Sequence, residues 1–245
     1  MPTAEWMKQY EAVRHILDSN VGLDSYFTEE RIGTQKVDVL EIGELQIPTG
    51  QLIACDPFVS LGDAEPYLQT IPTGSYPVRL CVVPSEKYGD RYACAKLAVS
   101  EQKPVRYELA VTGQERLEGE LEEGSYFGFG VDAGMACVAD LATQTACSAY
   151  VKAAEQKDED FDLYSDVLEE QLQKNVLAHP KYQREGGDWL NWTVPGTEAS
   201  VAIFTSGWGD GYYPVYFGFD SQEKVCGVYI QCIDIERTYT EEEEA

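Results

Sequence analysis

The feature that most constrains the fold is a glycine-rich loop between two strand-like runs near the C-terminus. Residues 204–220 read FTSGWGDGYYPVYFGFD, and the loop at their centre is Gly207–Gly211. Glycine adopts positive φ without steric cost, and an Asp-Gly pair favours a hairpin turn. The flanking runs, 200–205 and 212–219, are rich in β-branched and aromatic residues, as packed strands are. The segment therefore predicts two strands joined by a tight main-chain loop.

Short strand-like runs, separated by turn residues, also fill the first half of the chain. Because no helical pattern lies between them, they favour an antiparallel sheet or sandwich over a βαβ fold. Hydrophobic spacing predicts helices at 4–18, with Thr3 as the cap, and near 160–178. We therefore predict an α+β fold whose mostly antiparallel sheets form a two-layer, sandwich-like system flanked by these helices. The runs are 37–42, 51–55, 76–83, 92–99 and 105–111.

Three further segments complete the predicted architecture. Residues 141–154 are Ala-rich and favour a helix, and 225–235 favour a final, central strand. At 245 residues the chain is long enough for one large domain. We expect a single domain over 1–240 and a disordered acidic tail over 241–245, where a run of glutamates ends the chain.

The balance of acidic and basic residues limits which classes of molecule the protein can bind. The chain has 43 Asp and Glu residues against 18 Lys and Arg, which gives a formal net charge of -25. Such a surface repels phosphate backbones and anionic lipids, so we expect neither nucleic acid nor a membrane as a partner. Such an acidic surface favours a basic protein or a cation as the partner. Solubility alone is the alternative explanation, since a large net charge keeps proteins dispersed.

The cysteine pattern indicates whether the protein belongs in a reducing or an oxidising compartment. Seven cysteines are scattered through the chain without a C-x-x-C pair, and most lie inside apolar runs. This pattern is unlike a disulfide scaffold or a zinc site and indicates reduced core residues. The N-terminus lacks the pattern of a secretory signal, and no run approaches the ~20 apolar residues that span a bilayer. A soluble cytoplasmic protein is the expectation.

Common catalytic motifs are missing from the sequence. The only histidines are His15 and His179, neither in a metal-ligand spacing, and the sequence contains no G-x-S-x-G, no phosphate-binding glycine loop and no H-E-x-x-H. We therefore expect no cofactor, no metal and a protein without enzymatic activity.

Three aspartates beside turn residues are the only candidates for chemistry. Asp56 precedes a proline, while Asp132 and Asp210 lie next to glycine-containing turns. If they met in one cleft, they could bind a hard cation or act as general acid and base. The simpler interpretation is that each carboxylate caps a turn by accepting main-chain hydrogen bonds. We favour capping.

A small set of residues carries the predicted binding surface. Trp208 lies between two glycines of the loop and is expected to be partly exposed; Asp210 and Tyr212 follow it. Aromatic residues on loops are favoured binding anchors. Arg79, a scarce basic residue in an apolar strand, is expected either to pair with a carboxylate or to anchor a ligand.

Four motifs, in order, resemble a known family. They are Asp56-Pro57, Tyr76–Arg79, Val131–Gly134 and Ser206–Tyr212. Together they are similar to a mostly bacterial family catalogued only as a domain of unknown function, over about residues 40–235. The resemblance implies one domain and carries no catalytic residues. By analogy, some small acidic bacterial proteins are immunity proteins that neutralise toxins.

Two functional hypotheses follow. The first is a non-enzymatic acidic binding protein, of the immunity or antitoxin type, that recognises a basic protein partner through complementary charge. The alternative is a carboxylate- or metal-dependent hydrolase that uses Asp56, Asp132 and Asp210 on a small polar substrate. The alternative requires that the three carboxylates meet in one cleft.

Overall fold

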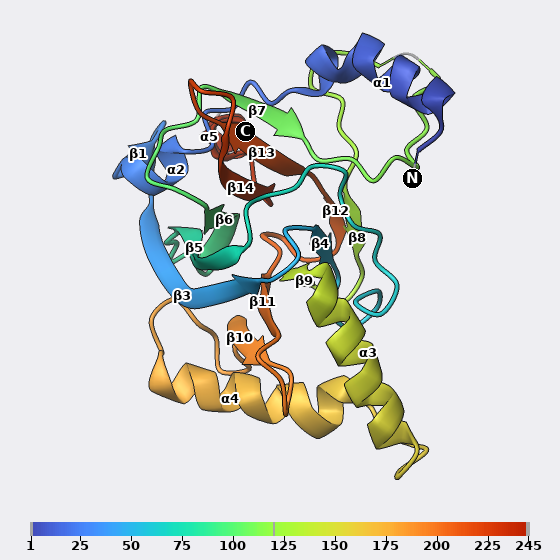
Figure 1. Cartoon of the computed structure of the whole chain (residues 1–245). Coiled ribbons are helices and arrows are strands. Elements are labelled where there is room, and N and C mark those ends of the chain that lie inside the picture. Colours follow the sequence, from blue (N-terminus) through green and yellow to red (C-terminus); the bar gives the residue numbers. More distant parts are fainter. Residues whose placement is uncertain (1, 120, 244–245) are drawn as a thin grey trace.

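The computed structural model describes residues 2–119 and 121–243 (Figure 1). The helices are α1 (Ala4–Leu17), α2 (Ser25–Thr28), α3 (Leu141–Glu155), a π-helical turn (Tyr164–Leu168) that leads into α4 (Glu169–Ala178), and α5 (Ile235–Glu243). The strands are β1 (Arg31–Ile32), β2 (Gln35–Lys36), β3 (Asp38–Ile47), β4 (Leu52–Cys55), β5 (Gly74–Val83), β6 (Arg91–Ala98), β7 (Arg106–Leu109), β8 (Phe129–Val131), β9 (Met135–Asp140), β10 (Trp189–Thr193), β11 (Ser200–Thr205), β12 (Gly211–Tyr213), β13 (Val215–Phe219) and β14 (Val225–Gln231).

The larger sheet has six strands in the order β3-β5-β6-β14-β13-β7, and each neighbouring pair is antiparallel. Strand β14 is central, as predicted, although it ends at Gln231 and α5 begins at Ile235. Edge strand β3 contains a bulge: its pairing with β5 shifts between Glu41, opposite Arg79, and Glu44, opposite Pro77. The extra residue bends β3.

The smaller sheet has four antiparallel strands in the order β10-β11-β9-β4. Its two inner strands are almost completely apolar and buried. Two short pairs, β12 with β8 and β1 with β2, complete the strand pairing.

The two sheets pack face to face around one apolar core. Leu80 of β5, Val138 of β9 and Phe204 of β11 lie in that core, and each is at most 1% exposed. Because side chains alternate across a strand, the next residue along each of these strands points to an outer face. Both sheets therefore have two covered faces, which explains their near-continuous apolar runs.

Helices cover the outer faces, so the molecule has four layers (Figure 1). Cys81 of β5 packs in a cluster with Tyr10 and Leu17 of α1, together with residues of α2 and α5. On the opposite side, Ile203 of β11 packs in a cluster with Leu172 of α4 and residues of α3. The predicted α+β class, the mostly antiparallel sheets and the two long helices are confirmed.

The runs that flank Gly207–Gly211 are strands joined by a tight loop, as predicted, but they do not pair with each other as a hairpin. Strand β11 pairs with β9 and β10 in the four-stranded sheet, whereas β12 pairs with β8 and β13 belongs to the six-stranded sheet. The glycine loop therefore carries the chain from one sheet to the other. The β-type composition of both flanks is correct, but local composition does not specify which sheet a strand joins.

The helix boundaries follow the sequence signals. Thr3 caps α1, since its side-chain oxygen accepts a hydrogen bond from the main-chain N–H of Trp6 at 3.1 Å. Helix α3 covers the Ala-rich segment, and α4 ends at Ala178, where the predicted helix near 160–178 ends. The segment 241–245 falls partly in α5, which extends to Glu243, and residues 244–245 lie outside the described residues.

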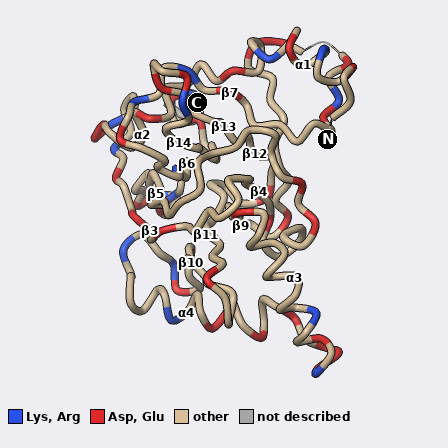
Figure 2. The backbone as a smooth tube through the Cα atoms, viewed as in Figure 1, with Lys and Arg blue, Asp and Glu red and all other residues tan. Residues whose placement is uncertain are grey.

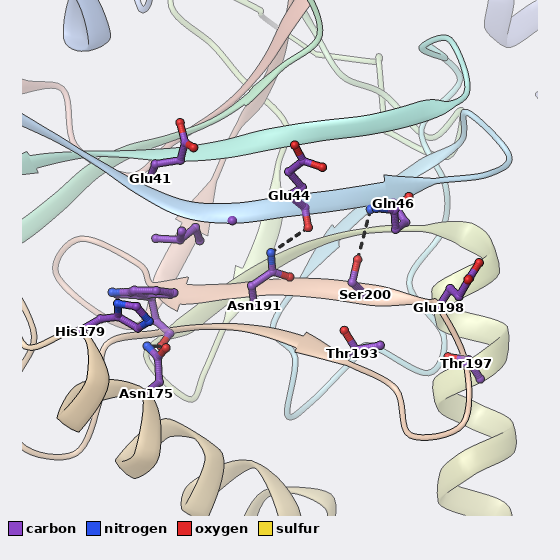
Figure 3. Close-up of a pocket in the computed structure, with 13 residues that line it drawn as sticks. Glu41, Glu44, Gln46, Asn175, His179, Asn191, Thr193, Thr197, Glu198 and Ser200 are labelled. Carbon is purple, nitrogen blue, oxygen red and sulfur yellow. Dashed lines mark hydrogen bonds between the residues drawn. The ribbon is translucent and has the colours of Figure 1, made fainter.

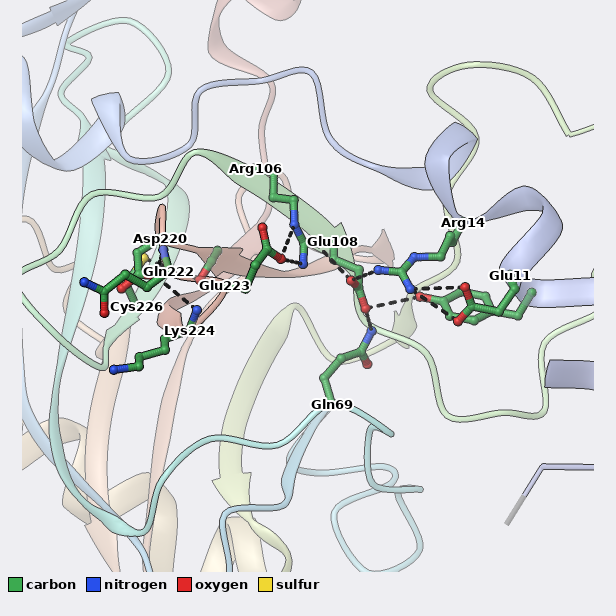
Figure 4. Close-up of polar contacts among 12 residues, drawn as sticks. Glu11, Arg14, Gln69, Arg106, Glu108, Asp220, Gln222, Glu223, Lys224 and Cys226 are labelled. Carbon is green, nitrogen blue, oxygen red and sulfur yellow. Dashed lines mark hydrogen bonds and ion pairs between the residues drawn. The ribbon is translucent and has the colours of Figure 1, made fainter. Parts of the chain in front are cut away.

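A buried glutamate fastens α1 to the six-stranded sheet (Figure 4). Glu108 of β7 is 7% exposed. Its carboxylate accepts hydrogen bonds from Arg14 of α1 at 2.8 Å, from Arg106 at 3.0 Å and from Gln69 at 2.9 Å. Two cations and an amide compensate the cost of burying this charge. The N-terminal helix is thus anchored by charge as well as by its apolar face.

Acidic residues are spread along most of the chain rather than gathered on one element (Figure 2). All seven cysteines are free thiols, six of them buried, as predicted for core residues. Among residues 2–119 and 121–243, none of the helices combines the length and the apolar character needed to cross a membrane.

Candidate functional site

Three of the sequence motifs meet where the chain crosses between the two sheets. Asp56 follows β4, is 1% exposed and uses both carboxylate oxygens. Oδ2 accepts hydrogen bonds from the main-chain N–H groups of Asp132 at 2.9 Å and Ala133 at 2.8 Å. Oδ1 accepts one from the N–H of Phe58 at 2.9 Å. The Asp56 carboxylate therefore holds the turn between β8 and β9.

The glycine loop holds the same turn from its other side. The carboxylate of Asp210 accepts a hydrogen bond from the N–H of Gly134 at 3.0 Å, and the N–H of Ser206 donates to the Gly134 carbonyl oxygen at 3.2 Å. The structure thus brings the Asp56, Asp132 and Asp210 segments together. At this junction Asp56 and Asp210 bind main-chain N–H groups, as turn-capping carboxylates do. In the part of the chain that the structure describes, no group of three or more His, Cys, Asp or Glu side chains is placed to hold a metal ion.

The loop itself is shaped by close main-chain packing. The N–H of Gly209 donates to the Ser206 carbonyl oxygen at 2.9 Å and closes a turn whose second residue, Gly207, has φ +58. A Cβ atom at Gly207 would lie 2.9 Å from Cγ1 of Ile233. The Tyr213 hydroxyl lies 2.7 Å from the Ser206 carbonyl oxygen and 2.6 Å from that of Gly209. These contacts leave Trp208 at the exposed tip.

A cleft of about 620 Å³ adjoins the loop, and we call it the aromatic cleft. It lies between the end of α1, residues 124–126, the glycine loop with β12, and the start of α5. Trp208 is 47% exposed, Tyr212 55% and Tyr126 46%. Exposed aromatic side chains gathered in one cleft are typical of protein interaction sites, and aromatic residues are common anchors at interfaces.

Carboxylates line the aromatic cleft beside these rings. Asp210, Asp234 and Asp18 come from the glycine loop, the start of α5 and the end of α1. Oδ1 of Asp18 is buried and has no hydrogen-bond partner among the described residues. Burial, reinforced by the nearby Glu108 charge, raises the pKa of Asp18 above its ordinary value. Arg106 and Arg14 already act on the Asp18 charge, and a cationic group entering the cleft would add the hydrogen-bond donor that Oδ1 lacks.

One contact inside the protein shows what the Trp208 ring accepts. The guanidinium carbon of Arg91 lies 4.9 Å from the centroid of the Trp208 ring, and the Tyr88 ring meets it edge-on at 6.3 Å. A cation over an indole face is attracted by the ring quadrupole. Exposed rings together with carboxylates therefore suit a guanidinium or ammonium group.

The predicted binding residues do not all lie in one place. Trp208, Asp210 and Tyr212 line the aromatic cleft, but Arg79 does not. Arg79 lies on β5 and pairs with Glu41 of β3 at 3.2 Å, one of the two arrangements that the sequence suggested.

Sequence reasoning did not identify Asp18, Tyr126 or Asp234 as part of this site. They come from three separate segments, and only the packing of α1 and α5 on the six-stranded sheet brings them together. No local pattern marks them.

The fold and the cleft define an acidic α+β sandwich protein with a surface cleft of aromatic and carboxylate side chains. The chain belongs to the family described as "Protein of unknown function (DUF4241)", whose model matches residues 45–230. Membership of a family of unknown function is thereby confirmed. The matched range contains the whole junction around residues 131–134 but neither α1 nor α5. Searches of curated proteins and of solved structures gave no match.

Proposed function

We propose that the protein is a non-enzymatic binding protein, of the immunity or antitoxin type, which takes basic side chains of a protein partner into the aromatic cleft. The observation that carries the proposal is the pairing of exposed aromatic rings with carboxylates in one cleft. Trp208 and Tyr212 supply the rings, and Asp18 and Asp210 supply the charge.

The electrostatics of the whole chain support a basic partner. A net charge of -25 attracts cations over distances longer than a contact and accelerates encounter. Long-range attraction does not select an orientation, however. The aromatic cleft supplies the local contacts, because a cation–π interaction requires the cation to lie over a ring face.

The first experiment uses a defined probe. We would titrate the full chain with a fluorescent oligo-arginine peptide, with the isosteric but uncharged oligo-citrulline peptide for comparison. The expected result is binding of the arginine peptide alone. Trp208→Ala and Tyr212→Ala should each weaken it roughly threefold to tenfold, the range of one exposed or partly desolvated cation–π contact.

Tyr164→Ala is the matched control. Tyr164 is an aromatic residue of similar exposure, 40%, but it lies in the helical layer over the four-stranded sheet and contacts Phe58. This variant should bind like the wild type. Equal affinity of all variants would show that charge alone attracts the peptide, and the proposed cleft would be wrong.

The hydrolase alternative gains no support from the geometry. Asp56, the most buried of the three aspartates, has both oxygens occupied by main-chain N–H groups, so it is poorly placed to transfer a proton. We also propose a cytoplasmic location. The support is that all seven cysteines are free, which suits a reducing compartment.

A further inference from the structure

A second cleft, of about 750 Å³, lies where the two sheets separate at their edges (Figure 3). Strand β3 of the larger sheet forms one wall, and β10 with the start of β11 forms the other. The end of α4 closes one side. We call it the edge cleft. It is lined largely by polar side chains, in contrast to the apolar core a few residues further along the same sheets.

Side chains, rather than main-chain pairing, connect β3 to β10 and to the start of β11 here. The side-chain amide of Asn191 on β10 donates to the Glu44 carbonyl oxygen of β3 at 2.8 Å, and the hydroxyl of Ser200 accepts from the N–H of Gln46 at 3.2 Å. A Cβ atom at Gly43, in the β3 bulge, would lie 2.7 Å from Nδ2 of Asn191. The bulge and its glycine therefore make room for Asn191 and hold the cleft open.

One buried donor in this cleft lacks a partner. Trp189 of β10 lines the cleft and is 5% exposed, yet its indole Nε1 has no hydrogen-bond partner among the described residues. A buried N–H without an acceptor costs free energy, so it calls for an explanation. The ring of His179, which is exposed, lies 5.5 Å from the buried Trp189 ring.

Unused acceptors accompany that donor. Asn175 and Asn191 each spend their amide N–H on a carbonyl oxygen, that of Trp189 and that of Glu44. Their Oδ1 atoms accept no hydrogen bond from the described residues, and the hydroxyl of Thr193 is likewise unused. Besides Glu198, which precedes β11, the edge cleft thus presents uncharged donors and acceptors on this side.

The charged residues of β3 are turned away from this interior. In Figure 3 the carboxylates of Glu41 and Glu44 lie on the far side of β3 from Asn191. Each has its own partner there, Arg79 for Glu41 and the Ser75 hydroxyl for Glu44. The acidic surroundings nonetheless disfavour an anionic ligand.

We propose that the edge cleft binds a neutral polyhydroxylated ligand of the sugar or polyol class. A hydroxyl group both donates and accepts, so one oxygen of such a ligand accepts from the Trp189 indole N–H. Neighbouring hydroxyls donate to Oδ1 of Asn175 and of Asn191 and form a hydrogen bond with the Thr193 hydroxyl. The exposed His179 ring gives a flat surface for the C–H groups of a sugar ring. This site is separate from the aromatic cleft and does not depend on the proposed partner.

The test follows the indole N–H signals of the ¹⁵N-labelled full chain by NMR. The probes are maltose, cellobiose, chitobiose and myo-inositol at millimolar concentration, with gluconate as an anion and arginine ethyl ester as a cation. Trp189→Phe assigns the Trp189 signal. At least one neutral probe should shift that signal in a saturable way, while gluconate and the arginine ester should not. Absence of any shift with all four neutral probes, or a saturable shift with a charged probe alone, overturns the proposal.

Variants make the assignment specific. Followed through the side-chain NH₂ signals of Asn175 and Asn191, Trp189→Phe should weaken binding of the active probe roughly tenfold. Thr193→Val, at an exposed position of β10, should weaken it roughly threefold, the range of one lost hydrogen bond. Trp6→Phe removes an indole N–H that donates to Glu115 on the other side of the molecule, and it should leave the affinity unchanged. Should Trp189→Phe fail to fold, Thr193→Val decides, because wild-type affinity in that variant contradicts the proposed contacts.

Discussion

Asp56 shows how a carboxylate that resembles a catalytic residue in the sequence can be committed to structure. Its position beside a proline was compatible with either role. In the fold it accepts three main-chain hydrogen bonds at 2.8–2.9 Å, and its side chain is almost completely buried. Two of these bonds reach a turn that is 76 and 77 positions away in the sequence. The residue ties distant segments together and has no free oxygen for chemistry.

Asp56→Asn should therefore destabilise the protein although it preserves the side-chain shape. The amide offers one acceptor oxygen instead of two, and its NH₂ group meets N–H donors, so we expect a loss of about 2–4 kcal/mol in the free energy of unfolding. Urea unfolding followed by circular dichroism measures it. Asp63→Asn is the matched control, because Asp63 is exposed and should change stability by less than about 0.5 kcal/mol. Equal stability of the two variants would contradict the structural role.

Gly207 and Gly209 illustrate two different reasons why a loop requires glycine. Both have positive φ, +58 and +104, but only Gly207 is crowded, by Ile233 and Cys232. Gly209→Ala should cost about 1 kcal/mol from backbone strain alone, and Gly207→Ala about 2–3 kcal/mol because a clash is added. Thermal and urea unfolding of the pair compare the two costs. A larger loss at Gly209 would mean that crowding does not determine the loop.

At the scale of elements, Asp38 links the start of β3 to the segment that follows α4. Its carboxylate accepts hydrogen bonds from Lys181 at 2.8 Å and from Tyr182 at 2.7 Å. These contacts, that with Lys181 foremost, lower the pKa of Asp38 from 3.8 to about 2. Because the folded pKa is depressed, the stabilisation is complete above the unfolded value and is lost as the pH falls from about 4 to about 2.

Asp38→Asn tests this linkage. The variant should melt at a lower temperature than the wild type near neutral pH, and the gap between them should shrink as the pH falls from about 4 to about 2. Melting temperatures measured across that pH series give the result. Since the pair is partly exposed, the effect should also diminish in high salt. A gap that is independent of pH would show that the Asp38 charge contributes nothing.

The elements themselves were predictable from the sequence because their signals are local. The Thr3 cap, the spacing of Tyr10 and Leu17 on α1, and the Ala-rich α3 are each contained in about fifteen residues. The assignment of β11 and β12 to different sheets was not predictable. Strand pairing is decided by contacts such as that of Phe204 with Ala136, which lies 68 positions earlier, and composition carries no information about them.

For the whole molecule, sequence reasoning identified the loop residues of the aromatic cleft but not the residues opposite them. Trp208, Asp210 and Tyr212 are marked by their glycine neighbours. Asp18 and Tyr126 enter the cleft only because the sheet brings their segments to it. The edge cleft was not predicted at all, since it depends on where two sheets diverge.

Net charge acts on the molecule as a whole. A formal charge of -25 on a compact fold repels itself, and salt screens that repulsion because the Debye length falls from about 30 Å at 0.01 M to about 8 Å at 0.15 M. Partly buried contacts such as those of Glu108 with Arg14 and Arg106 are screened less than exposed ones. Raising the salt concentration should therefore increase the melting temperature rather than lower it. Scanning calorimetry in sodium chloride and in potassium chloride should show the same rise, since screening depends on ionic strength and not on the identity of the cation. A fall in melting temperature would mean that exposed ion pairs stabilise the fold more than its charge repulsion opposes it. A rise with one cation only would indicate a specific ion site instead of screening.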